Sequence, residues 1–289
     1  NDVPLDGVTI VDPLRSENRE RYAAELFTLR KLKGITKEFA SHMVLDPNVF
    51  GALMVKMGDA DGLISGVSQH YPDTVRPLLQ IIGSRKDSPR VAGIMIVTFR
   101  NKTYFLADAT MNVEPDADCL ANIAILTARL ARRFNVTPKV AMLSFSNFGS
   151  VNHRLVRLVQ DATRKVRERE PDLTVEGEMQ ADTAVDPVLA RSLFPFSAIQ
   201  GDANVLVFPD LTSSNIAYKL LRKLGGAESI GPVIMGMNLP VHALHQSSEV
   251  LDVVNLTALA VTDAQDLKGP GNRKGGCCGC GSARKQKAD

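Results

Sequence analysis

The chain has 289 residues, of which 44% are apolar and 23% charged, enough to bury a sizeable core in one large or two medium domains. This composition excludes intrinsically disordered and fibrous proteins. Charged residues, glycine or proline interrupt every apolar run before it reaches the roughly 18 to 20 residues of a spanning helix, so we expect no membrane association.

The net charge of +2 is unevenly distributed, because residues 268–289 carry +5 and the remainder carries −3. With no tryptophan and 5% aromatic residues, the body lacks the basic and aromatic surface of a nucleic-acid-binding protein. Cys119 is the one cysteine outside the tail, which holds Cys277, Cys278 and Cys280. No disulfide framework is expected, and a reducing cytoplasm is the predicted compartment.

In chain order, short β-branched runs predict strands and amphipathic segments between them predict helices. The strands are expected at residues 8–11, 63–65, 94–99, 103–107, 140–145 and 205–208, and the helices at 16–33, 116–134, 151–169, 214–224 and 249–261. This alternation is typical of an α/β layered fold. Residues 267–289, rich in glycine, cysteine and basic residues, are expected to be a disordered tail that offers no fourth ligand for a closed metal site.

Strong catalytic signatures are missing from the sequence: there is no P-loop, no H-E-x-x-H run and no G-x-S-x-G elbow. No G-x-G-x-x-G run follows a predicted strand, so no dinucleotide site is expected. The remaining candidates come from turns and from basic side chains.

A predicted strand runs into a hydroxyl-rich turn before the helix at 151–169. The turn contributes backbone amides and small polar side chains, an arrangement that suits a phosphate or another anion; its candidate ligands are Ser144, Ser146, Asn147, Gly149 and Ser150. An ordinary strand-to-helix turn has the same appearance.

Two arginines at the edges of predicted helices, Arg30 and Arg76, are candidate phosphate ligands because a guanidinium matches phosphate geometry. A solvated basic helix face is the alternative. Asp210 and Asn215 follow the strand at 205–208 and are candidates for the same site, although plain helix capping also explains Asp210.

Together these segments resemble the phosphate acetyltransferase family over almost the whole body. The matching blocks are residues 8–13, 29–36, 58–66, 73–82, 140–144, 205–219 and 230–239. The resemblance implies a two-lobed, three-layer α/β/α fold, similar to isocitrate and isopropylmalate dehydrogenases, that binds coenzyme A at its cleft. The lobes would be residues 1–88 with 237–266, lacking the opening segment of the family, and residues 89–236.

In this family the thiol of coenzyme A attacks acetyl phosphate without a covalent enzyme intermediate. By resemblance, Arg30 and Arg76 correspond to the phosphate-site arginines and Asp252 to the general base. The family carries a Ser-Arg-Gly-Cys run where this chain has His245, Gln246 and two serines. Because the loss of one preorganised donor costs about 10²- to 10³-fold, the substitutions predict a nearly silent site.

An intact scaffold with an altered catalytic run resembles the C-terminal domain of bacterial hybrid NADP-dependent malic enzymes. This resemblance implies an acetyl-CoA-binding regulatory domain, with an N-terminal malic-enzyme domain as its partner and a homodimer or larger oligomer as its assembly. The NADP and divalent-metal sites would belong to that partner domain, and no metal site is expected here.

Two alternatives remain open from the sequence. The chain is an active phosphate acetyltransferase in which Asp252, Arg30 and Arg76 suffice and His245 replaces the missing hydroxyl. Otherwise it is an oligomerisation module that associates through the apolar helix at 250–261.

Overall fold

The computed structural model describes residues 6–268, and its largest element is a six-stranded sheet in the order β5-β4-β6-β3-β2-β7. Only β2 runs against its neighbours, because β3, β6, β4 and β5 are mutually parallel and β7 pairs antiparallel with β2. The strands are β2 (Ala92–Phe99), β3 (Lys102–Ala107), β4 (Lys139–Leu143), β5 (Thr174–Met179), β6 (Val205–Val207) and β7 (Glu228–Met235).

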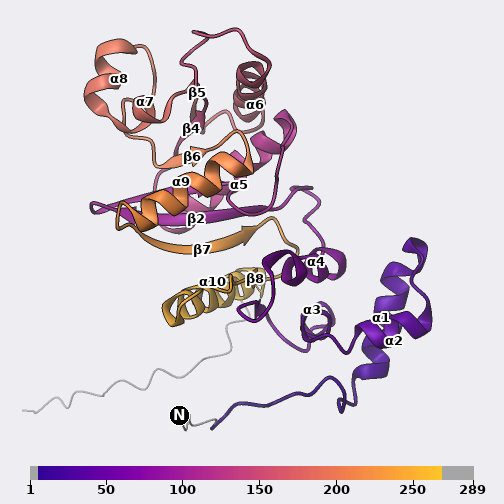
Figure 1. The fold of residues 1–289 in the computed structure, drawn as a ribbon. Helices are drawn as coiled ribbons and strands as arrows, with labels where there is room; N and C mark the ends of the chain where they lie inside the picture. The colour runs from indigo at the N-terminus through magenta and orange to yellow at the C-terminus, as the bar shows by residue number, and fades with distance from the viewer. Residues whose placement is uncertain (1–5, 269–289) are drawn as a thin grey trace, which may run out of the picture.

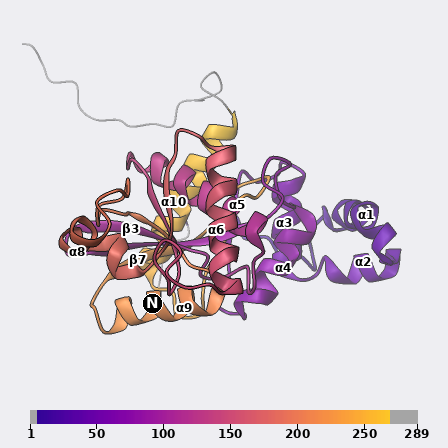
Figure 2. The ribbon, with the colours of Figure 1, turned by 90° about the horizontal axis from the view of Figure 1, so that it is seen from above.

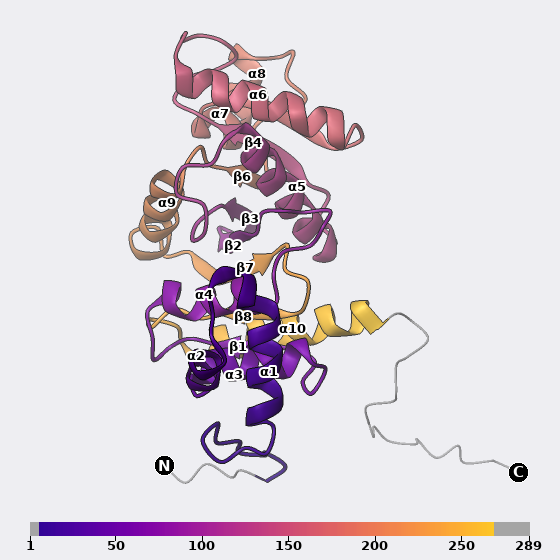
Figure 3. The ribbon, with the colours of Figure 1, turned by 90° about the vertical axis from the view of Figure 1, so that its right-hand side faces the viewer.

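Helices cover both faces of this sheet (Figure 3). The α5 helix (Ala117–Arg133) presents an apolar stripe to one face, with α6 (Arg154–Arg169) packed beside it. On the other face lie α7 (Ala181–Val185), followed along the chain by α8 (Pro187–Leu193), and α9 (Leu211–Lys223). The predicted α/β layered fold is confirmed.

A smaller part of the molecule is built from the two ends of the described chain (Figure 1). Strand β1 (Leu63–Ser65) pairs in parallel with β8 (Val241–Ala243) in this part, which also contains several helices. They are α1 (Arg19–Arg30), the 3-10 turn η1 (Lys31–Lys33), α2 (Lys37–Met43), α3 (Pro47–Lys56), α4 (Tyr71–Ile81) and α10 (Val250–Lys268). The α1 and α2 helices project away from the six-stranded sheet (Figure 2).

The chain passes between the two parts twice, and the two crossings are hydrogen bonded to each other. Ser84 and Met237 form an antiparallel bridge, and the backbone N–H of Arg85 donates to the carbonyl of Gly236 at 2.8 Å. The Asn238 amide reinforces the crossing by donating to the carbonyl of Ile82 at 3.0 Å. The lobe boundaries predicted from the sequence stay a prediction.

Five of the six predicted strands are present, with ends that shift by up to two residues. The strand predicted at residues 8–11 is wrong: the segment is irregular, and Val8 and Ile10 are 60% and 78% exposed because no described strand lies beside them. The last predicted helix continues to Lys268, so residues 267 and 268 are helical instead of tail. The rest of that tail, with Cys277, Cys278 and Cys280, lies outside the described residues. Within residues 6–268 no helix is long and apolar enough to cross a membrane.

Candidate functional site

Two aromatic side chains meet between the smaller part and the six-stranded sheet. Tyr71 begins α4 and His245 follows β8, and their rings stack with centroids 4.5 Å apart and an interplanar angle of 23°. The loop before His245 is held close to β1, because the N–H of Leu244 donates to the carbonyl of Ser65 at 2.7 Å. A Cβ on Gly66, which has a φ of +122°, would collide with the Leu244 backbone, so only glycine allows this approach.

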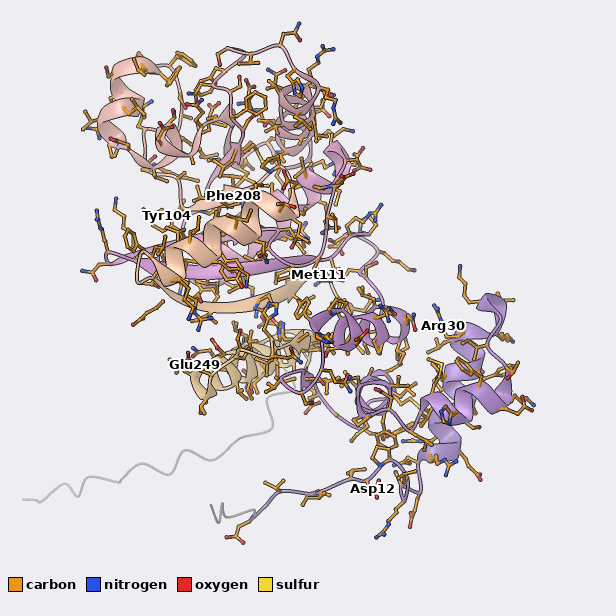
Figure 4. The ribbon with its side chains drawn as sticks, viewed as in Figure 1. Asp12, Arg30, Tyr104, Met111, Phe208 and Glu249 are labelled. Carbon is orange, nitrogen blue, oxygen red and sulfur yellow. The ribbon has the colours of Figure 1, made fainter. Side chains whose placement is uncertain are left out.

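The turn that follows β3 lies against Tyr71. Buried Asp108 accepts hydrogen bonds from the backbone N–H groups of Gly93, Thr110 and Met111 at 2.9 to 3.1 Å. Burial raises the pKa of Asp108, and these hydrogen bonds oppose that rise. The turn places the Thr110 hydroxyl 3.1 Å from the Tyr71 hydroxyl. Met111 lies at the junction of the two parts (Figure 4).

One face of α9 points toward this turn. Asn215, Tyr218, Lys219 and Arg222 are spaced i, i+3, i+4 and i+7, which places them along one side of the helix. Asn215 donates to the carbonyl of Ala109 at 3.2 Å, and Tyr218 is buried. The C-terminal end of this face reaches the start of α10, where Arg222 Nη2 lies 3.5 Å from Glu249 Oε1.

The surroundings of His245 disfavour the charged form of its ring. Burial lowers its pKa, and the positive charges of Lys219 and Arg222 lower it further, while the Asp252 carboxylate acts in the opposite direction. His245 Nε2 is buried without a hydrogen-bond partner among the described residues. A neutral imidazole with an open ring nitrogen can donate or accept one hydrogen bond from a ligand.

Asp252 provides a carboxylate beside this ring. It lies in the first turn of α10 with only 8% of its surface exposed, and its Oδ2 accepts the backbone N–H of Glu249 at 2.8 Å. The second oxygen leaves capacity to accept a proton. The charge of Asp252 acts on the His245 ring, and the catalytic roles predicted for both residues stay predictions.

The smaller part also carries the predicted residues Gln246, Arg76 and Arg30. Gln246 is exposed in the adjoining loop, and Arg76 is exposed on α4, paired with Asp73 at 3.3 Å. Arg30 is the last residue of α1, and Figure 4 shows it on the projecting helix, well separated from Glu249. The structure does not bring Arg30 into this group.

The predicted anion turn is occupied by the protein's own side chains. Ser146 is buried and donates to Glu178 Oε1 at 2.9 Å, and the N–H of Gly149 donates to the same oxygen at 2.6 Å. Asn147 Oδ1 accepts from the N–H of Gln180 at 2.7 Å. Ser150 lies 3.0 Å from the Ser146 hydroxyl, and Ser144 binds the Met179 carbonyl through its N–H at 2.8 Å.

Asp210 caps α9, because its carboxylate accepts the backbone N–H of Ser213 at 2.8 Å. Sequence reasoning missed Tyr71, Thr110, Lys219 and Arg222. The sequence did contain a signal for Lys219 and Arg222, because they follow Asn215 at helical spacing. For Tyr71 and Thr110 there was none, because their contact joins residues 39 positions apart.

No group of three or more His, Cys, Asp or Glu side chains within residues 6–268 is arranged to hold a metal ion. His242 is a core residue: its Nδ1 accepts from the N–H of Ile234 at 3.2 Å, and its Nε2 lies 3.4 Å from Asp263 Oδ2.

Comparison with known proteins identifies the family of this fold and site. Residues 1–261 match the family described as phosphate acetyl/butaryl transferase. The chain belongs to this family. A phosphate acetyltransferase of Bacillus subtilis is 41% identical over 260 residues, which are 90% of this chain and 80% of the relative. One of Acetivibrio thermocellus is 39% identical over 274 residues, covering 92% of this chain and 82% of the relative.

A solved phosphotransacetylase of Streptococcus pyogenes superposes with a TM-score of 0.84 at 40% identity, covering 90% of this chain and 79% of that one. These acyltransferase relatives share the architecture described above.

The prediction of a silent regulatory domain of an NADP-dependent malic enzyme is wrong. Relatives about 40% identical over nine-tenths of the chain are named phosphate acetyltransferase, and these findings give no support to a malic-enzyme partner domain, to NADP or to allosteric regulation. The physical reason why the prediction is wrong lies in the residues around positions 245 and 246. His245 and Gln246 replace two residues, but Asp252, Lys219 and Arg222 still supply a carboxylate and positive charge near His245.

Proposed function

We propose that this chain is an active phosphate acetyltransferase, which exchanges an acetyl group between the sulfur of coenzyme A and phosphate. The observation that carries the proposal is the buried Asp252 carboxylate and the unpartnered His245 Nε2, with the charges of Asp252, Lys219 and Arg222 acting on the His245 ring, in a chain 41% identical to a phosphate acetyltransferase. Coenzyme A and acetyl phosphate are substrates in this proposal, and no tightly bound cofactor takes part.

The reaction needs a thiolate, a polarised carbonyl and a stabilised leaving group. In the proposed direction Asp252 accepts the thiol proton, and the sulfur attacks the carbonyl carbon of acetyl phosphate. As the carbon–sulfur bond forms, the bond from that carbon to the bridging oxygen breaks and phosphate leaves. The open Nε2 of neutral His245 can donate a hydrogen bond to the carbonyl oxygen as negative charge develops there.

The remaining predicted ligands belong to the same proposal. Arg76 is a candidate for phosphate, and Arg30 is one only through a movement of α1 or a neighbouring subunit. Exposed Leu220 of α9 and exposed Leu224 directly after this helix support a homodimer. We further propose the lobe division at residues 88/89 and 236/237.

The test is a direct assay of acetyl-CoA formation from acetyl phosphate and coenzyme A, followed through thioester absorbance. Wild-type protein should show sustained turnover, and Asp252→Asn should reduce kcat by about 10²- to 10⁴-fold, as expected for the loss of a general base. Asp61→Asn, on the exposed surface, serves as the matched control. Wild-type protein without turnover would contradict the proposal.

A further inference from the structure

The face of α9 that lines the site ends in two cations that the predicted ligands do not include. Asn215 anchors its beginning to Ala109, and Tyr218 packs into the core below it. This anchoring fixes the helix rotation, so Lys219 and Arg222 must point along the same side as Asn215. Their influence on His245 agrees with this placement.

The loop that carries His245 brings no positive charge of its own. Residues 244–249 contain neither lysine nor arginine, and Gln246 is neutral and exposed. Arg76 is partly neutralised by Asp73, the two side chains being 64% and 55% exposed. The positive charges that act on the His245 ring are those of Lys219 and Arg222 on α9.

Arg222 has a counter-ion that a ligand can displace. Its side chain is 28% exposed and lies 3.5 Å from Glu249, whose side chain is 78% exposed. An exposed ion pair of this kind contributes little, because solvent screens it. A phosphate dianion accepts two parallel hydrogen bonds from a guanidinium and carries more charge than one carboxylate.

We propose that Arg222 binds a phosphate group of the substrates, with Lys219 adding positive charge beside it and Glu249 leaving the guanidinium when phosphate arrives. This inference rests on the proposed function, since it names a substrate ligand of the same site. The shared chemistry is a terminal phosphoryl group, which is present as the acyl phosphate of acetyl phosphate and as the 3′-phosphate monoester of coenzyme A.

The experiment compares Arg222→Gln with Lys223→Gln, the adjacent exposed cation on the same helix, as a charge-matched control. Steady-state KM is measured for acetyl phosphate, for coenzyme A and for dephospho-coenzyme A, and binding of inorganic phosphate is measured by calorimetry. Arg222→Gln should raise one substrate KM and the phosphate Kd by about ten-fold or more, as expected for a lost charge-assisted hydrogen bond.

The pattern of KM changes shows which substrate phosphate Arg222 binds. A higher KM for acetyl phosphate assigns Arg222 to the acyl phosphate, whereas a higher KM for coenzyme A but not for dephospho-coenzyme A assigns it to the 3′-phosphate. If Arg222→Gln changes neither KM nor phosphate binding more than Lys223→Gln does, the inference is overturned.

Glu249→Gln provides a second test, because it removes the carboxylate beside Arg222 at a side chain that is 78% exposed. Removing the competing carboxylate should tighten phosphate binding by about two- to five-fold, the range expected for an exposed ion pair; unchanged binding would overturn the displacement step. Wild-type protein that binds phosphate through Arg222 without turnover would contradict the proposed function and leave the Arg222 site standing.

Discussion

Tyr71 and His245 stack at 4.5 Å although 174 residues separate them in the chain, and this contact joins α4 to the loop after β8. The pair lies against Thr110 on one side and near the cations of α9 on the other. It therefore couples the position of the imidazole to three segments of the fold.

The first prediction concerns the ionisation of His245. Burial and the charges of Lys219 and Arg222 lower its pKa below the ordinary value of 6.5. Because the unfolded chain then binds the proton more tightly, His245 should cost stability as pH falls below 6.5 and through the folded pKa. An NMR titration, with His245→Ala used to assign the resonance, should give a midpoint below 6.5. A midpoint at or above that value would contradict the description of the site.

The second prediction separates the hydroxyl of Tyr71 from its ring. Tyr71→Phe keeps the stack and loses the contact with Thr110, so kcat/KM should fall about five-fold or less. Tyr71→Ala also loses the aromatic pair, and the fall should be about ten-fold or more. Tyr104→Phe removes a hydroxyl from β3, away from the site, and should leave kcat/KM unchanged. Equal rates for Tyr71→Phe and Tyr71→Ala would show that the stack has no role.

The third prediction concerns Gln246, which is exposed next to His245. Gln246→Arg adds a planar donor pair for phosphate and should raise kcat/KM for acetyl phosphate, whereas Gln246→Lys adds a point charge and should raise it less. Both variants are assayed beside the wild type at low and high salt. Flat rates for both would argue that position 246 does not face the substrate.

The fourth prediction is a pH-dependent contribution of Asp263 to stability. Burial alone would raise the pKa of Asp263, but the His242 ring 3.4 Å away and the charge of Arg133 outweigh it and lower that pKa. The stabilisation is thus complete above the ordinary carboxyl pKa of about 3.9 and is lost as pH falls through the lower folded value.

Asp263→Asn should accordingly reduce the free energy of unfolding by about 1 to 3 kcal/mol at neutral pH, and by progressively less below about pH 4. Urea denaturation across this range measures the difference. Asp266→Asn is the matched control, because Asp266 lies 3.8 Å from the same arginine but is 72% exposed. A deficit that persists unchanged at low pH would refute the ion-pair explanation.

Sequence patterns predicted the elements whose burial is uniform. The apolar stripe of α5 and the continuous apolar runs of β2, β3, β4 and β6 are clear in the sequence. The predicted ends of these elements differ from the observed ends by up to two residues. Strand β5 was missed because Glu176 and Glu178 make it look polar. Glu178 is nevertheless buried, since Ser146 and Gly149 donate to its carboxylate.

Strand β7 was missed for a different reason. Gly231 and Pro232 interrupt its apolar run and suggest a turn. The strand lies at the edge of the sheet, where a proline without an N–H is tolerated. A local pattern does not reveal which strand will be at an edge.

The candidate site was predictable only in part. Asp252 and His245 were assigned through motif resemblance, and their catalytic roles stay a prediction. Inferring lost activity from two substitutions failed because it considered positions 245 and 246 alone. The cations of α9 come from another segment, and only the folded chain shows that they affect the same ring.

The pairing of β1 with β8 joins Leu63 to Val241, so a very long loop must close before these two short strands meet. Closing this loop costs conformational entropy, and the contacts that offset the cost form only late in folding. We expect the six-stranded sheet to form first and His245 to reach Tyr71 only in the last step. In pulsed hydrogen exchange, the amide of Leu244 should gain protection after those of β3 and β4. The reactive centre would then be the final part of the protein to mature.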